Sequence, residues 1–144
     1  MKLEVDDKDF QAWASAVEAK IASNEVKSAV ERQLGKVGNA GLAIFKTNTQ
    51  VVSGRLRRSW QVKKPIYSGS GWNMTFENNA KYARFVEYGH RQQPGRYVPA
   101  IGKRLKNAWV EGTFYNRKSA EQLQEKIGGI MKPVSEAFND ILGK

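Results

Sequence analysis

Apolar residues recur at helical spacing through the first third of the chain. The first run defines one face of a predicted helix and consists of Phe10, Trp13, Val17 and Ile21. Asp7 or Asp9 can cap the start of this helix, because a carboxylate suits the positive end of the helix dipole. Ser23 and Asn24 then interrupt the pattern and can cap a second helix.

A second stripe of similar period predicts a longer helix. Its members are Val26, Val30, Leu34, Val37, Gly41, Ile44 and Phe45. Gly35, Gly38 and Gly41 each weaken a helix by up to about 1 kcal/mol relative to Ala. Either another element approaches closely at these glycines or the helix kinks there, and the sequence leaves both open. The polar run 47–50 ends the helix.

The middle of the chain changes to a period of two. Residues 61–67 and 72–78 flank the Gly/Ser stretch 68–71, and Trp72, Met74 and Phe76 alternate with polar residues. This pattern predicts a β-hairpin with a four-residue turn. Pro65 lacks an N–H and therefore belongs at an edge or a strand end.

A short helix is predicted over about residues 80–88, capped by Asn79 and ended by Gly89. Tyr82, Phe85 and Val86 lie on one side of it and are assigned to the core rather than to an interface. The polar stretch 89–95 is predicted to be a flexible loop that becomes ordered on assembly.

Two more strands, over residues 96–101 and 105–115, are predicted from their Val, Tyr, Trp and Phe content and join around residues 102–103. Residues 119–122 match a capping box. The helical stripe that follows consists of Leu123, Ile127, Ile130, Val134, Phe138 and Ile141. Pro133 predicts a kink or break inside this last helix.

The expected fold class is α+β, because helices and strands are segregated along the chain. It comprises N-terminal helices, a small antiparallel sheet of about four strands with a short inserted helix, and a C-terminal helix kinked near Pro133. A length of 144 residues indicates a single domain. Within it we expect a helical part (1–50), a basic sheet-forming core (51–118) and the C-terminal helix (119–144).

Charge is unevenly distributed. The net charge is +10, and residues 35–118 hold sixteen Lys/Arg against three Asp/Glu, or +13, whereas residues 1–34 carry −2 and residues 119–144 carry −1. A basic centre can bind nucleic acid or an acidic protein, or it can serve solubility. The chain has no cysteine, which excludes disulfides and thiolate metal sites and favours the cytoplasm. No run is long enough to span a membrane, and the acidic start lacks a signal-peptide pattern.

No catalytic residue, metal site or cofactor is predicted. The single histidine, His90, stands in a Gly-His-Arg sequence, and the only acids of the basic region are Glu77, Glu87 and Glu111, far apart in sequence. Metal-dependent hydrolysis needs clustered ligands. An enzyme would have to rely on an acid–base pair such as His90 with Glu87.

Nucleic-acid binding is the main alternative function. Basic residues stand beside aromatic ones twice, with Arg55, Arg57 and Arg58 next to Trp60, and 103–106 before Trp109. Phosphate contact and base stacking need this combination. Both tryptophans fit equally well as core residues of strands, and a basic protein-binding surface explains the same charges.

Two motifs suggest a family. Residues 51–59, Val-Val-Ser-Gly-Arg-Leu-Arg-Arg-Ser, resemble the "Val-Asp-Thr-Gly-x-Leu-Arg-x-Ser" stretch of the tail-completion, or head–tail joining, proteins of long-tailed bacteriophages and prophages, also known as neck or minor tail components. Residues 82–89, Tyr-Ala-Arg-Phe-Val-Glu-Tyr-Gly, are similar to that family's "Tyr-Ala-x-x-Val-Glu-x-Gly". Residues 95–100 resemble the segment that follows. The chain departs from the family at Ser53, where Thr is usual, and at His90, which replaces Thr.

The resemblance implies a structural virion protein, assembled in the bacterial cytoplasm, without catalytic residues. Such proteins form a ring, generally taken to be six-fold, between the head connector and the tail terminator, with DNA passing through the lumen without tight binding and no membrane contact. The family-motif residues with an expected structural role are Gly54, Leu56, Tyr82, Ala83, Val86 and Gly89. The expected contacts with other subunits or partners are Arg55, Arg57, Arg58, Arg84, Glu87, Arg91 and Arg96.

Physical chemistry assigns roles to several motif residues. Gly54 can adopt a backbone conformation that residues with a Cβ avoid, or it can allow close packing at the start of the following helical turn. Leu56 is expected to anchor that turn in the core. The three arginines of the first motif project outward. We hypothesise that they form bidentate bonds with carboxylates of a neighbouring subunit, with Glu87 as the candidate partner.

Overall fold

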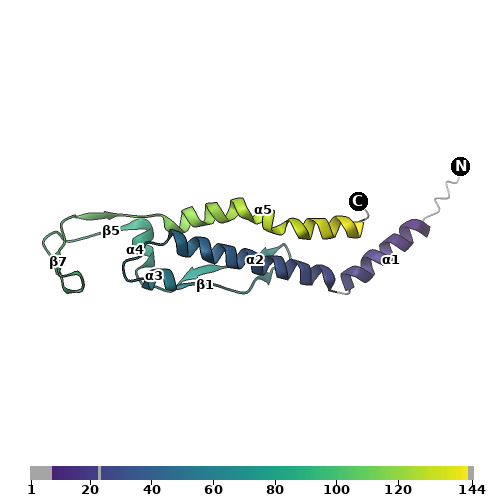
Figure 1. Cartoon of the computed structure of the whole chain (residues 1–144), viewed down its shortest axis with the longest axis horizontal. Helices are drawn as coiled ribbons and strands as arrows, with labels where there is room; N and C mark the ends of the chain where they lie inside the picture. The colour runs from purple at the N-terminus through teal and green to yellow at the C-terminus, as the bar shows by residue number, and fades with distance from the viewer. Residues whose placement is uncertain (1–7, 23, 143–144) are drawn as a thin grey trace. The chain divides into compact units, whose positions relative to one another are not determined.

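The computed structural model describes residues 8–22 and 24–142, and Figure 1 labels its elements. Asp7 and Ser23 lie outside the described residues, as do the side chains of Asp9, Phe10 and Ile21. The chain forms two compact units, one of residues 1–38 with 126–144 and one of residues 39–125. Helices and short antiparallel strands confirm the α+β class.

The first unit consists of helical segments. It holds α1 (Lys8–Ala22), the first part of α2 (Glu25–Asn48) and the last part of α5 (Tyr115–Leu142). Asn24, at a positive φ of 59°, separates α1 from α2, which confirms the predicted interruption. The expected stripe of α2 is half-buried at Val26, Val30 and Leu34 and buried at Val37.

Helix α5 begins earlier than predicted, and it is not broken at Pro133. It begins at Tyr115, four residues before the expected capping box, so Ser119 lies inside the helix and donates a hydrogen bond of 2.6 Å to the Tyr115 carbonyl. It also runs through Pro133 without a break, so of the predicted kink or break the break does not occur, and the kink stays a prediction. Pro133 removes one backbone hydrogen bond, and the remaining bonds of a helix of 28 residues tolerate this loss.

An aromatic cluster forms the core of the second unit. The ring centroid of Phe45, on α2, lies 4.5 Å from that of Trp60 and 5.1 Å from that of Phe76. Trp60 also meets Tyr115 of α5 edge-on at 5.9 Å. Trp60 is buried, and its indole N–H donates to Thr49 Oγ1 at 2.8 Å. Of the two tryptophans considered for base stacking, Trp60 is therefore a core residue.

Gly41 shows why a glycine stands on the buried face of α2. A Cβ placed there would lie 2.5 Å from Cζ of Phe76 and 2.9 Å from Cδ2 of Leu123. Close approach of other elements is therefore the reason for this glycine. Nothing lies within 4 Å of the corresponding position at Gly35, so that glycine has no such role.

Helices α2 and α5 are joined by side-chain hydrogen bonds inside the second unit. Asn48 Nδ2 donates to Ser119 Oγ at 3.1 Å and to Gln122 Oε1 at 2.9 Å. Ser119 is fully buried. A short serine is thus required where the two helices meet.

In the part of the chain that the structure describes, the strands form four separate two-stranded ladders rather than one sheet of about four strands. In the predicted hairpin, β1 (Trp60–Val62) pairs with β4 (Phe76–Asn78), and β2 (Ile66–Tyr67) pairs with β3 (Trp72–Asn73). The hairpin and its turn at 68–71 are therefore confirmed. Pro65 lies between β1 and β2, where its missing N–H interrupts the ladder.

The remaining strands form an extended hairpin, residues 89–111, hereafter the arm. At its root β5 (Gly89–Arg91) pairs with β8 (Trp109–Glu111), and at its far end β6 (Tyr97–Val98) pairs with β7 (Lys103–Arg104) around a 3-10 turn, Pro99–Ile101. Figure 1 shows β7 at the end of the arm distant from α4. The stretch 89–95, predicted to be a loop, is thus partly strand, because 108–111 supplies a pairing partner distant in sequence.

Candidate functional site

The first motif forms a tight turn into α3 (Arg55–Arg58). Gly54 adopts the left-handed conformation with φ of 74°, as expected, and the N–H of Arg58 bonds its carbonyl at 3.0 Å. Leu56, two residues after Gly54, is buried, as expected of the residue that anchors the turn. The motif therefore consists of one buried leucine between exposed arginines.

Asn78 ties this turn to the approach of the second motif. Its Nδ2 donates to the Leu56 carbonyl at 2.8 Å, while its Oδ1 accepts from the N–H of Ala80 at 3.0 Å. Helix α4 (Ala83–Tyr88) then begins after Tyr82 and ends at Gly89, whose φ is 83°. The prediction that Asn79 caps this helix is wrong. The side chain that accepts from the N–H of Ala80 is that of Asn78, and the helix begins only at Ala83.

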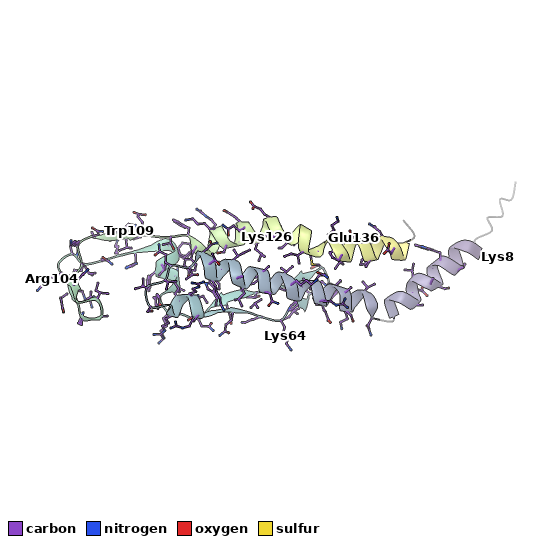
Figure 2. The ribbon with its side chains drawn as sticks, in the orientation of Figure 1. Lys8, Lys64, Arg104, Trp109, Lys126 and Glu136 are labelled. Atoms are coloured by element: carbon purple, nitrogen blue, oxygen red, sulfur yellow. The ribbon has the colours of Figure 1, made fainter. Side chains whose placement is uncertain are left out.

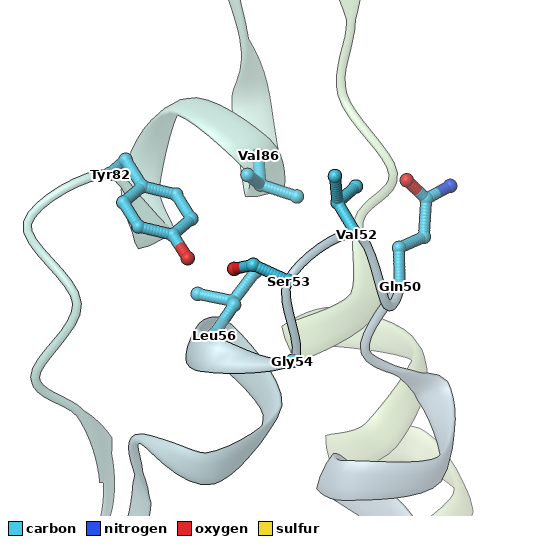
Figure 3. Close-up of a pocket in the computed structure, with 7 residues that line it drawn as sticks. All are labelled: Gln50, Val52, Ser53, Gly54, Leu56, Tyr82 and Val86. Atoms are coloured by element: carbon cyan, nitrogen blue, oxygen red, sulfur yellow. The ribbon is translucent and has the colours of Figure 1, made fainter. Parts of the chain in front are cut away.

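The two motifs, far apart in sequence, meet in one small pocket (Figure 3). Its volume is about 70 Å³, and it is lined by Gln50, Val52, Ser53, Gly54, Leu56, Tyr82 and Val86. In Figure 3, Leu56 of the first motif and Tyr82 and Val86 of the second face the same space. We call this region, residues 50–58 with 82–88, the motif junction.

The motif junction leaves apolar side chains in contact with solvent. Val52 is 94% exposed and Phe85 54% exposed, while Val51, Tyr82 and Tyr88 are also exposed. The prediction that Tyr82 and Phe85 belong to the core is therefore wrong, and Val86 is half-buried. A run of exposed apolar residues beside a pocket is a feature of interaction sites.

Glu87 is the buried member of α4, at 5% exposure. Its Oε2 accepts from the backbone N–H of Asn116 at 2.7 Å, and its Oε1 accepts from that of Arg117 at 3.2 Å. These N–H groups belong to the first turn of α5, where the helix leaves donors without partners and the dipole attracts a carboxylate. Glu87 therefore caps α5, which corrects the expectation that it faces an arginine of a neighbouring subunit.

Further bonds join the end of α4 to the start of α5. The N–H of Thr113 donates to the Val86 carbonyl at 2.9 Å, and the N–H of Phe114 donates to the Glu87 carbonyl at 3.1 Å. The Tyr115 hydroxyl donates to the Ala83 carbonyl at 3.2 Å. Burial is the main cause that raises the pKa of Tyr115 to about 12, and the nearby Glu87 carboxylate contributes as well. The hydroxyl therefore keeps its proton and can donate.

The six arginines predicted as contact residues are all exposed: Arg55, Arg57, Arg58, Arg84, Arg91 and Arg96. None of these arginines forms an ion pair among the described residues, where the pairs observed include Lys27–Glu31, Lys63–Glu77 and Lys132–Glu136. Arg58 bonds the Ser53 carbonyl at 3.4 Å and so lies against the pocket-lining loop. Arg84 lies at a second hollow, with Tyr88 and Asn116.

The acid–base pair considered for catalysis does not form among the described residues: Glu87 accepts from the backbone of α5, whereas His90 Nε2 lies 3.4 Å from Gln92 Nε2. His90 is half-buried in β5, with Nδ1 enclosed and its ring edge-on to Phe85 at 5.9 Å. No group of three or more His, Cys, Asp or Glu able to hold a metal ion occurs in the part of the chain that the structure describes. Within that same part, every helix is too short or too polar to cross a bilayer.

Sequence reasoning missed the cap by Glu87 and the link through Asn78. The sequence did hold one signal for the true start of α5. Tyr115, Ser119 and Leu123 follow one another at intervals of four residues, as positions on one helix face do, and the structure buries all three. The partners of Glu87 are 29 and 30 positions away, and no local pattern reveals them.

One comparison with known proteins finds a match. The model of the HK97-gp10-like family, described as "Bacteriophage HK97-gp10, putative tail-component", matches residues 13–89 of the 144, just over half of the chain. The matched region includes both motifs and all of the motif junction. No curated protein and no solved structure matches.

Proposed function

The chain belongs to the HK97-gp10-like family of bacteriophage tail components, and from this premise we propose that it is a structural protein of the phage neck. In this proposal copies of the chain form a ring around the DNA channel. We expect the ring to be a hexamer, as the resemblance to the tail-completion family implies. The ring joins the tail to the head connector and contacts the connector on one side and the tail terminator on the other. Its place is the virion, after assembly in the host cytoplasm, and it carries out no reaction.

The observation that carries the proposal is the exposed apolar surface of the motif junction. Val52 is 94% exposed although it lines the pocket between the two motifs. A β-branched apolar side chain in water contributes nothing to the fold of its own chain. Its exposure is explained when a second chain covers the junction. A patch on one subunit that meets a different patch on the next gives a head-to-tail contact, which closes into a ring when the rotation from subunit to subunit completes a full circle.

In this proposal the exposed arginines around the motif junction form the charged edge of the contact. Arg55 and Arg57 are exposed on α3, on either side of buried Leu56. Arginine forms bidentate bonds with carboxylates, which fix orientation as well as add affinity. Because Glu87 is bound inside its own chain, the matching carboxylates must come from other residues of the neighbour.

Native mass spectrometry of the purified chain, alone and mixed with the connector and terminator proteins of the same phage, tests the proposal. We expect a homo-oligomer, or a complex with at least one of these partners, because some ring components assemble only on a neighbour that serves as a template. A monomer in every mixture, with no partner bound, would overturn the proposal.

A further inference from the structure

The arm carries a concentration of positive charge that is largely unbalanced. Residues 89–111 include five Lys/Arg and a single acid, Glu111, which lies at the root of the arm opposite Gly89. These five cations are exposed: Arg91, Arg96, Lys103, Arg104 and Lys106. None of them has a carboxylate partner among the described residues. Such a segment repels itself until an anionic partner binds.

The backbone holds the arm as a continuous two-stranded ribbon. Between its two ladders, the N–H of Gln92 donates to the Ala108 carbonyl at 2.8 Å, and the N–H of Gly95 donates to the Leu105 carbonyl at 2.8 Å. Arg104 also bonds the Gly95 carbonyl at 2.7 Å. Figure 2 shows Arg104 near the far end of the ribbon and Trp109 nearer its root. The cations are therefore carried by an ordered element.

The register of the ribbon distributes the cations over both of its faces. Tyr97 is paired with Arg104, and Val98 with Lys103. Residues directly opposite each other in a ladder share a face, and successive residues alternate. Arg104 therefore projects on one face, beside Tyr97, while Lys103 projects on the other.

We propose that the arm binds duplex DNA by inserting into the major groove and contacting phosphates on both walls. A two-stranded β-ribbon fits a groove about 12 Å wide. Phosphates line both sides of the groove, so they neutralise both faces of the ribbon. An acidic protein would cover one face and leave the cations of the other in water. The exposed Tyr97 and Trp109 add apolar contact area along the ribbon.

The proposed binding does not depend on base sequence, and its affinity decreases as the salt concentration rises. Contacts to phosphates position a protein without reading bases. Each phosphate contact contributes about 0.9 to the slope of log affinity against log salt concentration. Binding of this kind lets DNA move past the arm. The inference concerns the single chain and stands whether or not the chain forms a ring.

Fluorescence anisotropy with a labelled duplex of mixed sequence tests the inference on the full-length protein. The arm variant Arg96→Gln, Lys103→Gln, Lys106→Gln removes three cations and keeps the bond from Arg104. We expect its affinity to fall by about ten-fold or more at roughly 0.15 M salt and the salt slope to decrease by about 2.7. A matched control, Lys36→Gln, Lys118→Gln, Lys126→Gln, removes three exposed cations outside the arm and should bind within about two-fold of wild type, because none of them belongs to the ribbon proposed to enter the groove.

An RNA duplex of the same sequence gives a second reading. The major groove of A-form RNA is too deep and narrow for side chains to enter, so we expect weaker binding to RNA than to DNA. Equal affinity for both duplexes, equal losses in the two triple variants, or wild-type affinity in the arm variant would each overturn the inference. Circular dichroism verifies folding. If the arm variant is unfolded, the single substitution Lys103→Gln carries the test, with a smaller loss in the same direction.

Discussion

The carboxylate of Glu87 accepts a hydrogen bond of 2.7 Å from the backbone N–H of Asn116, in the first turn of α5. This bond joins a family motif to a helix that lies outside the matched region, residues 13–89. The glutamate of the second motif is therefore a structural residue. It holds α4 in place, and α4 supplies Tyr82 and Val86 to the motif junction.

Replacing Glu87 should destabilise the fold. Glu87→Ala leaves two part-buried N–H groups at the start of α5 without an acceptor, and we expect a loss of about 1–2 kcal/mol in the free energy of unfolding. Glu87→Gln keeps one acceptor oxygen and should lose less. Urea unfolding followed by circular dichroism measures both. Glu111→Ala, at an exposed glutamate of β8, is the control and should change stability by less than about 0.5 kcal/mol. If Glu87→Ala were as stable as the control, the cap would have no energetic role.

The alkaline stability of the protein should depend on Tyr115, whose folded-state pKa is raised to about 12. Below the usual pKa of about 10 both states hold the proton, so the full stability is present. Above it the unfolded chain loses its proton first, and stability falls by about 1.4 kcal/mol per pH unit until the folded pKa is reached. Urea unfolding at about pH 9 and about pH 11 measures this loss, since the two values bracket the unfolded pKa.

Tyr115→Phe should show a smaller alkaline loss than wild type, because it removes the ionising group. Tyr67→Phe changes an exposed tyrosine and should keep the wild-type loss. Equal alkaline losses in wild type and Tyr115→Phe would show that lysine titration, and not this phenol, accounts for the alkaline behaviour.

Two glycines of α2 should respond in opposite ways to the same substitution. Gly41→Ala places a methyl group 2.5 Å from Cζ of Phe76, whose ring is stacked on Phe45, and should cost about 1–3 kcal/mol. Gly35→Ala meets nothing within 4 Å and should stabilise the helix by up to about 1 kcal/mol. Thermal unfolding of the two variants gives the comparison. Equal shifts in Tm would mean that Gly41 is not a point of close packing.

Elements determined by local patterns could be predicted from the sequence. The apolar stripe of α2, the hairpin with its turn at 68–71, and the roles of Gly54 and Leu56 all follow from spacing or from one residue's conformational preference. Features that depend on distant partners were missed. The strand β5 exists because 109–111 pairs with it, and α5 begins early because Glu87 supplies its cap.

The candidate site was predicted in its residues but not in its geometry. Both motifs were identified from the sequence, yet only the structure places them at one pocket. Phe85 was assigned to the core because helical periodicity shows that apolar residues share a face without showing what covers that face. On α4 the buried position belongs to Glu87 instead.

The joining of heads to tails in phage particles that carry Val52→Glu tests the central proposal most directly. Val52 is 94% exposed, so the variant should fold like wild type, while its carboxylate blocks an apolar contact at the motif junction. Ile66→Glu, at another exposed apolar residue in β2, is the matched control. Electron microscopy of infected cells should show separate heads and tails for Val52→Glu and joined particles for Ile66→Glu. Joined, infectious particles with Val52→Glu in normal yield would contradict the proposal.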